Sequence, residues 1–154
     1  MIAAATKEMD NLEMQATHIL ETCLYVNDLV AAERFYQGVL GLELHSRQEG
    51  RHLFFRCGWR MLLLFDPAQS HQGPSMGIPA HGAVGAGHIA FGVREAELPA
   101  WREHLERSGI VIERTIDWPA GGQSLYFRDP AGNSLEFATP RIWNIPEATL
   151  QDPV

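Results

Sequence analysis

The sequence predicts an α+β protein: two β-α-β-β-β repeats that form a curved mixed-sheet trough with the helices on its outside. Three observations predict this fold class. Apolar and polar residues alternate in several short segments, which is typical of half-buried strands. Only two segments carry the 3–4 apolar spacing of a helix, and each follows the first strand of a repeat. The order of strand, helix and three strands then occurs twice.

Composition excludes several classes of partner. The chain has 154 residues, of which 45% are hydrophobic, so it can bury a core of its own. A net charge of -7 argues against nucleic acid and against an anionic membrane surface. No apolar run approaches the roughly 20 residues that span a bilayer. The first 17 residues carry charges and no signal-peptide core, so we expect a cytoplasmic location.

The elements of the first repeat follow from local patterns. Alternation predicts a strand over residues 18–26, and Asn27-Asp28 supplies an N-cap for a helix over residues 29–40. Gly41 can take the left-handed conformation that ends a helix. Further strands are predicted at residues 42–46, 51–57 and 60–65.

A long connection separates the repeats. Proline and glycine interrupt residues 66–87 so often that we expect no regular element there, and long ordered loops often bind ligands. In the second repeat a helix is predicted over residues 98–108, with Pro99 in its first turn and Gly109 at its end. Strands are predicted at residues 87–93, 110–116, 123–128 and 133–138.

These elements predict one domain. The predicted boundaries are an N-terminal arm (1–17), a single domain (18–140) made of repeats 18–66 and 87–139 with a connecting loop (67–86), and a C-terminal tail (141–154). The tail contains prolines, so we expect no further element in it.

The stretch Gly121–Phe137 predicts a β-hairpin, because two alternating runs flank the turn formers Asp129-Pro130-Ala131-Gly132-Asn133. Its second strand places Glu136 between Leu135 and Phe137. Such a carboxylate lies either on a solvated face or on a face that lines a pocket.

The internal repeat helps to decide whether Glu136 faces solvent or a pocket. Strand parity places Glu21 and His88 at equivalent trough-facing positions of the two first strands. Leu63 and Glu136 are equivalent on the two last strands. Three of these four residues are metal-ligand types, so their convergence favours a pocket that binds a metal.

The repeat and its motifs resemble the vicinal oxygen chelate superfamily over residues 18–140. This glyoxalase-like group includes glyoxalase I, extradiol dioxygenases, fosfomycin-resistance thiol transferases and bleomycin-resistance proteins. The resembling motifs are Tyr25-Val26-Asn27-Asp28-Leu29, Gly87-His88-Ile89-Ala90-Phe91 and Phe127-Arg128-Asp129-Pro130-Ala131-Gly132-Asn133-Ser134-Leu135-Glu136. The resemblance implies one divalent metal ion in the trough, a substrate that chelates it through two neighbouring oxygens, and a homodimer.

The chain departs from each subfamily. Glyoxalase I-like sites use four ligands, and Leu63 occupies the second position here; dioxygenase-like sites have His where Glu21 stands. The expected metal ligands are therefore Glu21, His88 and Glu136, a set that suits Zn, Ni, Mn, Fe or Co without selecting among them. Two carboxylates neutralise a divalent ion and disfavour oxygen chemistry, whose usual facial triad has two His.

Other residues are candidates for substrate binding. They are Tyr126, Trp118, His81, Tyr25 and Leu63. Tyr126 has trough parity and can hydrogen-bond an anion or simply pack. Trp118 lies in a loop at the trough mouth, and His81 lies in the long connection, where a solvated histidine is the alternative.

Three functions follow as hypotheses. The first is a metal-dependent isomerase, lyase or group transferase that binds a small molecule through vicinal oxygens, with Glu136 and Glu21 as the catalytic carboxylates. The alternatives are a non-catalytic sequestering protein, favoured by Leu63, and an extradiol dioxygenase-like enzyme. Whether the trough closes within one chain or across a dimer stays open.

Overall fold

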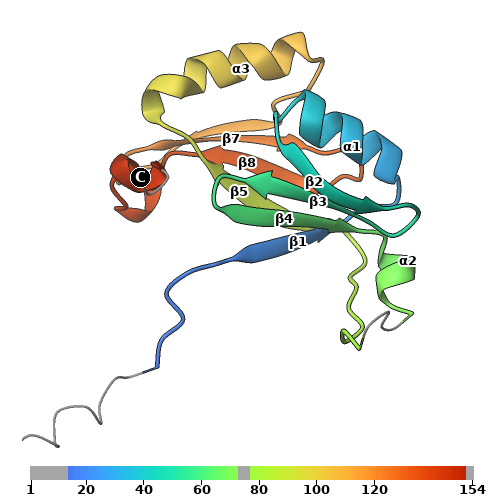
Figure 1. The fold of residues 1–154 in the computed structure, drawn as a ribbon. Helices are drawn as coiled ribbons and strands as arrows, with labels where there is room; N and C mark the ends of the chain where they lie inside the picture. Colours follow the sequence, from blue (N-terminus) through green and yellow to red (C-terminus); the bar gives the residue numbers. More distant parts are fainter. Residues whose placement is uncertain (1–13, 73–76, 152–154) are drawn as a thin grey trace, which may run out of the picture.

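The chain folds into two four-stranded mixed sheets, each with one long helix (Figure 1). This computed structural model describes residues 14–72 and 77–151. The first repeat contains β1 (Glu21–Tyr25), α1 (Leu29–Gly38), β2 (Glu43–Gln48), β3 (His52–Cys57) and β4 (Arg60–Phe65). The second contains β5 (His88–Gly92), α3 (Leu98–Arg107), β6 (Arg114–Asp117), β7 (Gln123–Arg128) and β8 (Ser134–Ala138).

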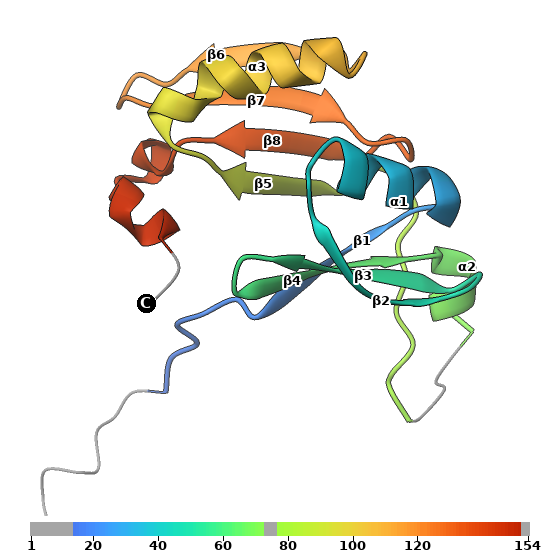
Figure 2. The same ribbon diagram turned by 45° about the horizontal axis from the view of Figure 1, so that its top comes forward.

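The two sheets have the same topology. Their strand orders are β1-β4-β3-β2 and β5-β8-β7-β6, with β1–β4 and β5–β8 parallel and the other pairs antiparallel. Figure 2 shows both sheets from the side on which α1 and α3 lie. The α+β class and the repeated unit predicted from the sequence are confirmed.

The predicted helix starts have a local cause. Asp28 accepts a hydrogen bond from the Ala31 amide at 2.9 Å, which satisfies one of the amides left free at the start of α1. Helix α3 instead has Pro99 in its first turn, where the missing N–H costs nothing.

One hydrophobic core joins the repeats. It includes Leu24, Phe55 and Leu64 from the first repeat and Leu105 and Leu125 from the second. Leu105 belongs to α3, and the other four lie on strands, where they alternate with residues on the opposite faces of the sheets; those opposite faces are the trough faces.

Two expectations about irregular segments are wrong. Residues 66–87 do contain a regular element, the one-turn helix α2 (Pro67–Ser70), because Asp66 caps it by accepting from the Ala68 amide at 2.8 Å. The tail also contains further elements, the 3₁₀ helices η2 (Pro140–Trp143) and η3 (Glu147–Leu150). A third 3₁₀ helix, η1 (Glu95–Glu97), leads into α3.

The predicted arm falls mostly outside the described residues. Residues 1–13 are not described, and residues 14–17 are exposed and have no helix or strand. Among the helices of residues 14–72 and 77–151, none is long and apolar enough to cross a membrane.

The turn between β7 and β8 ties the two repeats together. Buried Asn133 accepts a hydrogen bond from the Gly87 amide at 2.8 Å and donates to the Tyr25 carbonyl at 3.0 Å. It also donates to Asp129, which accepts from the Tyr36 hydroxyl at 2.9 Å. We call the three residues Tyr36, Asp129 and Asn133 the inter-repeat network.

Replacing Asn133 should destabilise the whole fold. Asn133→Ala leaves the Tyr25 carbonyl and the Gly87 amide without their partner in a buried site, so we expect a loss of about 3 kcal/mol in the free energy of unfolding. Urea unfolding followed by circular dichroism measures it. Exposed Asn27→Ala is the matched control and should change stability by less than about 0.5 kcal/mol. Equal effects of the two variants would contradict the role of the network.

Stability should fall at alkaline pH through Tyr36. Burial, and then the charge of Asp129 and the hydrogen bond to it, raise the pKa of Tyr36 far above its usual value. Above about pH 10 the unfolded chain releases this proton while the folded chain keeps it, so stability declines as pH rises. The sequence has a single lysine, Lys7, so lysines add little to this decline.

The test is urea unfolding at several values between about pH 8 and pH 11. Tyr36→Phe should flatten the alkaline decline, whereas Tyr126→Phe, which removes a much less buried hydroxyl, should leave most of it. An unchanged slope in Tyr36→Phe would show that other groups cause the decline.

Candidate metal-binding site

The trough face of the second sheet holds a His–Glu pair. His88 begins β5 and Glu136 lies on the adjacent strand β8, with His88 Nε2 3.3 Å from Glu136 Oε2. The other ring nitrogen, His88 Nδ1, lies 3.0 Å from the Ser134 carbonyl oxygen. A carbonyl can only accept, so Nδ1 carries a proton, and in the neutral ring Nε2 then offers its lone pair to a cation shared with the carboxylate. This is the arrangement of a metal-ligating histidine.

The carboxylate itself is buried and incompletely satisfied. Glu136 is only 4% exposed, and its Oε1 has no hydrogen-bond partner within the described residues. A buried carboxylate oxygen without a partner is costly. Glu136 and His88 would hold a divalent cation whose charge offsets that cost, so the two residues fit a metal ion.

Tyr126 completes this half of the trough. It lies opposite Glu136 in the β7–β8 register, and its ring stacks near that of His88 with centroids 6.3 Å apart. Burial, the charge of Glu136 and a hydrogen bond to it raise the pKa of Tyr126, against a smaller lowering by Ser124. The hydroxyl therefore stays protonated at neutral pH and can donate beside the carboxylate.

The first sheet carries the equivalent positions. The parallel registers pair Cys23 with Leu63 and Ala90 with Glu136, so Leu63 and Glu136 occupy the same place in the two repeats. Glu21, the equivalent of His88, is exposed at the start of β1. Residues 14–72 and 77–151 of one chain contain no group of three potential ligands, so a single chain joins His88 to Glu136 but not to Glu21.

Two predicted substrate residues meet on the first sheet. The Tyr25 hydroxyl lies 2.8 Å from His81 Nδ1, and the Cys23 thiol lies 3.8 Å from the same hydroxyl. Burial, with smaller effects of Cys23, raises the pKa of Tyr25. The His81 amide donates to the Ser70 carbonyl at 3.2 Å, which fixes this part of the connection to α2. The sequence contained no signal for this pairing across the connection.

Trp118 lies at the far end of the second sheet's trough face. Its indole N–H donates to Ser124 Oγ at 2.8 Å, and its side chain is 37% exposed. The tail reaches the same end, since a Cβ on Gly92 would lie 2.5 Å from Leu150. The sequence analysis missed this contact, although a glycine at a trough-facing strand position signals a close neighbour.

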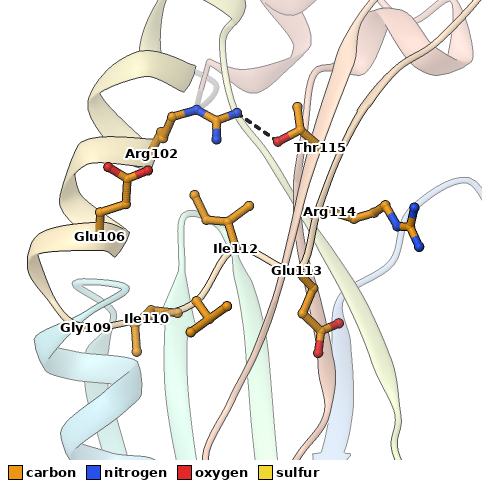
Figure 3. A pocket seen from close by; sticks show the side chains of 9 residues that line it. Arg102, Glu106, Gly109, Ile110, Ile112, Glu113, Arg114 and Thr115 are labelled. Atoms are coloured by element: carbon orange, nitrogen blue, oxygen red, sulfur yellow. Dashed lines mark hydrogen bonds between the residues drawn. The ribbon is translucent and has the colours of Figure 1, made fainter.

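A crevice outside the trough lies between α3 and the segment that leads into β6 (Figure 3). It has a volume of about 500 Å³ and is lined by Ile110 and Ile112 beneath charged side chains. Arg102 reaches across it to Thr115 at 2.9 Å, as the dashed line in Figure 3 marks. None of the predicted site residues lines this crevice.

Comparisons with known proteins give the family of the chain. The profile described as the Glyoxalase/Bleomycin resistance protein/Dioxygenase superfamily matches residues 16–137. A glutathione transferase FosA of Serratia marcescens is 33% identical over 116 residues, which are 73% of this chain and 74% of that protein. The crystal structure of a lactoylglutathione lyase from Agrobacterium tumefaciens is 44% identical, with a TM-score of 0.82, and the alignment covers 86% of this chain and 100% of the other.

A glyoxalase/bleomycin resistance protein/dioxygenase from Nocardioides has a TM-score of 0.66 at 26% identity, over 83% of this chain and 86% of the other. The chain belongs to the Glyoxalase/Bleomycin resistance protein/Dioxygenase superfamily. The resemblance seen in the sequence is confirmed. Two of these relatives are named as enzymes, which supports an enzymatic function in general.

Removing the buried charge should stabilise the metal-free protein. Leu63 occupies the equivalent position in the first repeat, so Glu136→Leu makes the two repeats alike there. The substitution also removes a buried carboxylate oxygen that has no partner within the described residues. We expect the free energy of unfolding without metal to rise by about 1 kcal/mol. Chelator-treated wild type and variant are compared by urea unfolding, with exposed Glu103→Leu as control. A clear loss of stability would show that Glu136 is satisfied without a cation.

Proposed function

We propose that the protein is a divalent-metal-dependent enzyme of glyoxalase type: a lyase, isomerase or group transferase that binds a small substrate through vicinal oxygens. The observation that carries this proposal is the buried Glu136 carboxylate, 3.3 Å from His88, with one oxygen that lacks a partner within the described residues. The names of the two enzyme relatives favour lyase or transferase chemistry over the other reactions of the superfamily.

In this proposal Glu21 of a second copy completes the ligand set with His88 and Glu136. Two features support a homodimer. Glu21 is exposed at the register position equivalent to His88, and within the described part of one chain it joins no ligand cluster. Leu63 cannot coordinate, so three protein ligands leave coordination positions for two substrate oxygens.

A divalent ion held by these residues would supply electrostatic stabilisation for negative charge that develops on the substrate oxygens. The chain's own residues supply the rest. Glu136 and Glu21 are the carboxylates available to accept a proton beside the substrate, and the Tyr126 hydroxyl can donate a hydrogen bond to one of its oxygens.

A sequestering protein is the second candidate. The central row of the first sheet's trough face, Cys23, Leu63 and Phe54, is apolar and only half-buried. Such a surface can bind a hydrophobic compound without any reaction. That function requires binding that survives removal of the metal.

Metal content tests the proposal. We expect about one divalent ion per chain in the wild type, measured by mass spectrometry after purification and reconstitution, and strong loss in Glu136→Ala and Glu21→Ala. Exposed Glu103→Ala on α3 should keep the ion. A wild type that binds no divalent ion after reconstitution would contradict the metalloenzyme and favour the sequestering protein.

Mixing the two variants tests the dimer. If each site takes Glu21 from one chain and Glu136 from the other, unfolding and refolding a mixture of Glu21→Ala and Glu136→Ala creates one intact site in every mixed dimer. Metal binding should then partly return, whereas sites that close within one chain would stay empty. Recovery is compared with each variant refolded alone.

A further inference from the structure

A cluster of rings lies on the trough face of the first sheet, outside the hydrophobic core. Its members, which we call the aromatic shelf, are Tyr25, His52, Phe54, Phe65 and His81. The strand members alternate with core residues such as Leu24, Leu53 and Phe55, so they point away from α1. Phe65 is buried, and the other four rings are half-buried.

The rings contact one another in a continuous series. His52 stacks on Phe54 with centroids 4.0 Å apart and planes 11° apart. Phe65 meets both edge-on, at 5.7 Å and 5.5 Å. His81 packs edge-on against Phe65 at 4.6 Å and hydrogen-bonds Tyr25. Ring planes held in different orientations offer both face and edge contacts to a further ring.

The shelf contains no acidic or basic side chain other than its two histidines, His52 and His81. Burial, with a smaller effect of Arg51, lowers the pKa of His52, so its imidazole is neutral at neutral pH. His52 Nδ1 is buried and has no hydrogen-bond partner within the described residues. The Tyr25 hydroxyl hydrogen-bonds His81 Nδ1, which leaves His81 Nε2 able to hydrogen-bond a ligand.

The shelf and the metal-binding half occupy corresponding places in the two repeats. Phe54 lies opposite Leu63 as Tyr126 lies opposite Glu136, and Tyr25 and His52 flank Phe65 one row further along the strands. A trough built from both sheets therefore has a polar half that holds ligands and an aromatic half.

We propose that the aromatic shelf binds an aromatic ring of the substrate, whose vicinal oxygens bind at the His88–Glu136 pair of the second copy, the pair that Glu21 of the same sheet completes. This inference rests on the proposed function and names its substrate class: a small aromatic compound with adjacent oxygen atoms. A tripeptide thiol such as glutathione carries two carboxylates, whereas the one arginine that acts on a shelf residue, Arg51, already donates to the Gln69 carbonyl at 3.1 Å. A neutral ring instead gains apolar burial and ring contacts there.

The first part of the test needs no metal. Chelator-treated, ¹⁵N-labelled protein is titrated with phenol, and amide shifts are followed by NMR. We expect shifts at Phe54, Phe65 and His81, a strong reduction in Phe54→Ala, and an unchanged response in Trp59→Ala. Trp59 is a matched control because it is exposed in the β3–β4 turn, at the opposite end of these strands from His52.

The second part uses two chelators with the same two oxygens. Metal-loaded protein is titrated with benzohydroxamate and acetohydroxamate by calorimetry. We expect the phenyl compound to bind about tenfold more tightly, and this ratio to fall toward one in Phe54→Ala while acetohydroxamate affinity is kept. Phe54→Leu, which keeps apolar area without a ring, should recover only part of the ratio.

The outcomes separate this inference from the proposed function. Phenol shifts at the shelf without hydroxamate binding would support the shelf and contradict the metal site. Hydroxamate binding with no phenyl preference and no phenol shifts would overturn the shelf and leave the metalloenzyme standing. Shelf signals that change with protein concentration and not with phenol would also overturn it, because a second copy then covers the shelf.

Discussion

The side chain of Asn133 is the contact on which the arrangement of the two repeats depends. Its carbonyl oxygen accepts from the Gly87 amide, immediately before His88, and its amide group donates to Asp129 and to the carbonyl of Tyr25. It therefore joins the start of β5, the end of β1 and the turn that leads into β8. Asn133 and Asp129 are buried and the Gly87 amide and the Tyr25 carbonyl are partly buried, so losing the Asn133 side chain leaves polar groups with little access to water. Gly87 allows the close approach, since a Cβ there would lie 2.8 Å from Leu24.

The two repeats share a backbone but differ in what they place on the trough face. At equivalent positions the second has His88, Glu136 and Tyr126, and the first has Glu21, Leu63 and Phe54. A buried carboxylate lowers the stability of the empty protein, and a leucine does not. Only the second repeat therefore loses stability to a buried carboxylate, and the equivalent position of the first repeat is apolar. This division allows one trough to hold both an ion and a hydrophobic group.

Much of the fold follows from local sequence patterns. The predicted strands at residues 60–65 and 123–128 have the observed bounds, because alternation is a property of the strand itself. The same parity placed Glu136 and His88 on one face, where the structure brings them together. Contacts between distant segments could not be predicted in this way. His81 reaches Tyr25 only through the path of the connection, and Leu150 reaches Gly92 only through the path of the tail. The two 3₁₀ helices of the tail and α2 each span only four residues, which is too few to leave a periodic pattern.

Tyr25 links the inter-repeat network to the aromatic shelf. Its backbone carbonyl accepts from Asn133, while its hydroxyl lies 2.8 Å from His81. His88 is similarly one residue from Gly87, whose amide binds the same asparagine. One buried side chain thus fixes the backbone beside both halves of the trough. A change there moves the His88–Glu136 pair relative to the aromatic shelf of the same chain, even though Asn133 touches neither ligand. In the proposed dimer each site takes its metal-binding half from one copy and its aromatic half from the other, so the inter-repeat network of both copies determines how the two halves meet on one substrate.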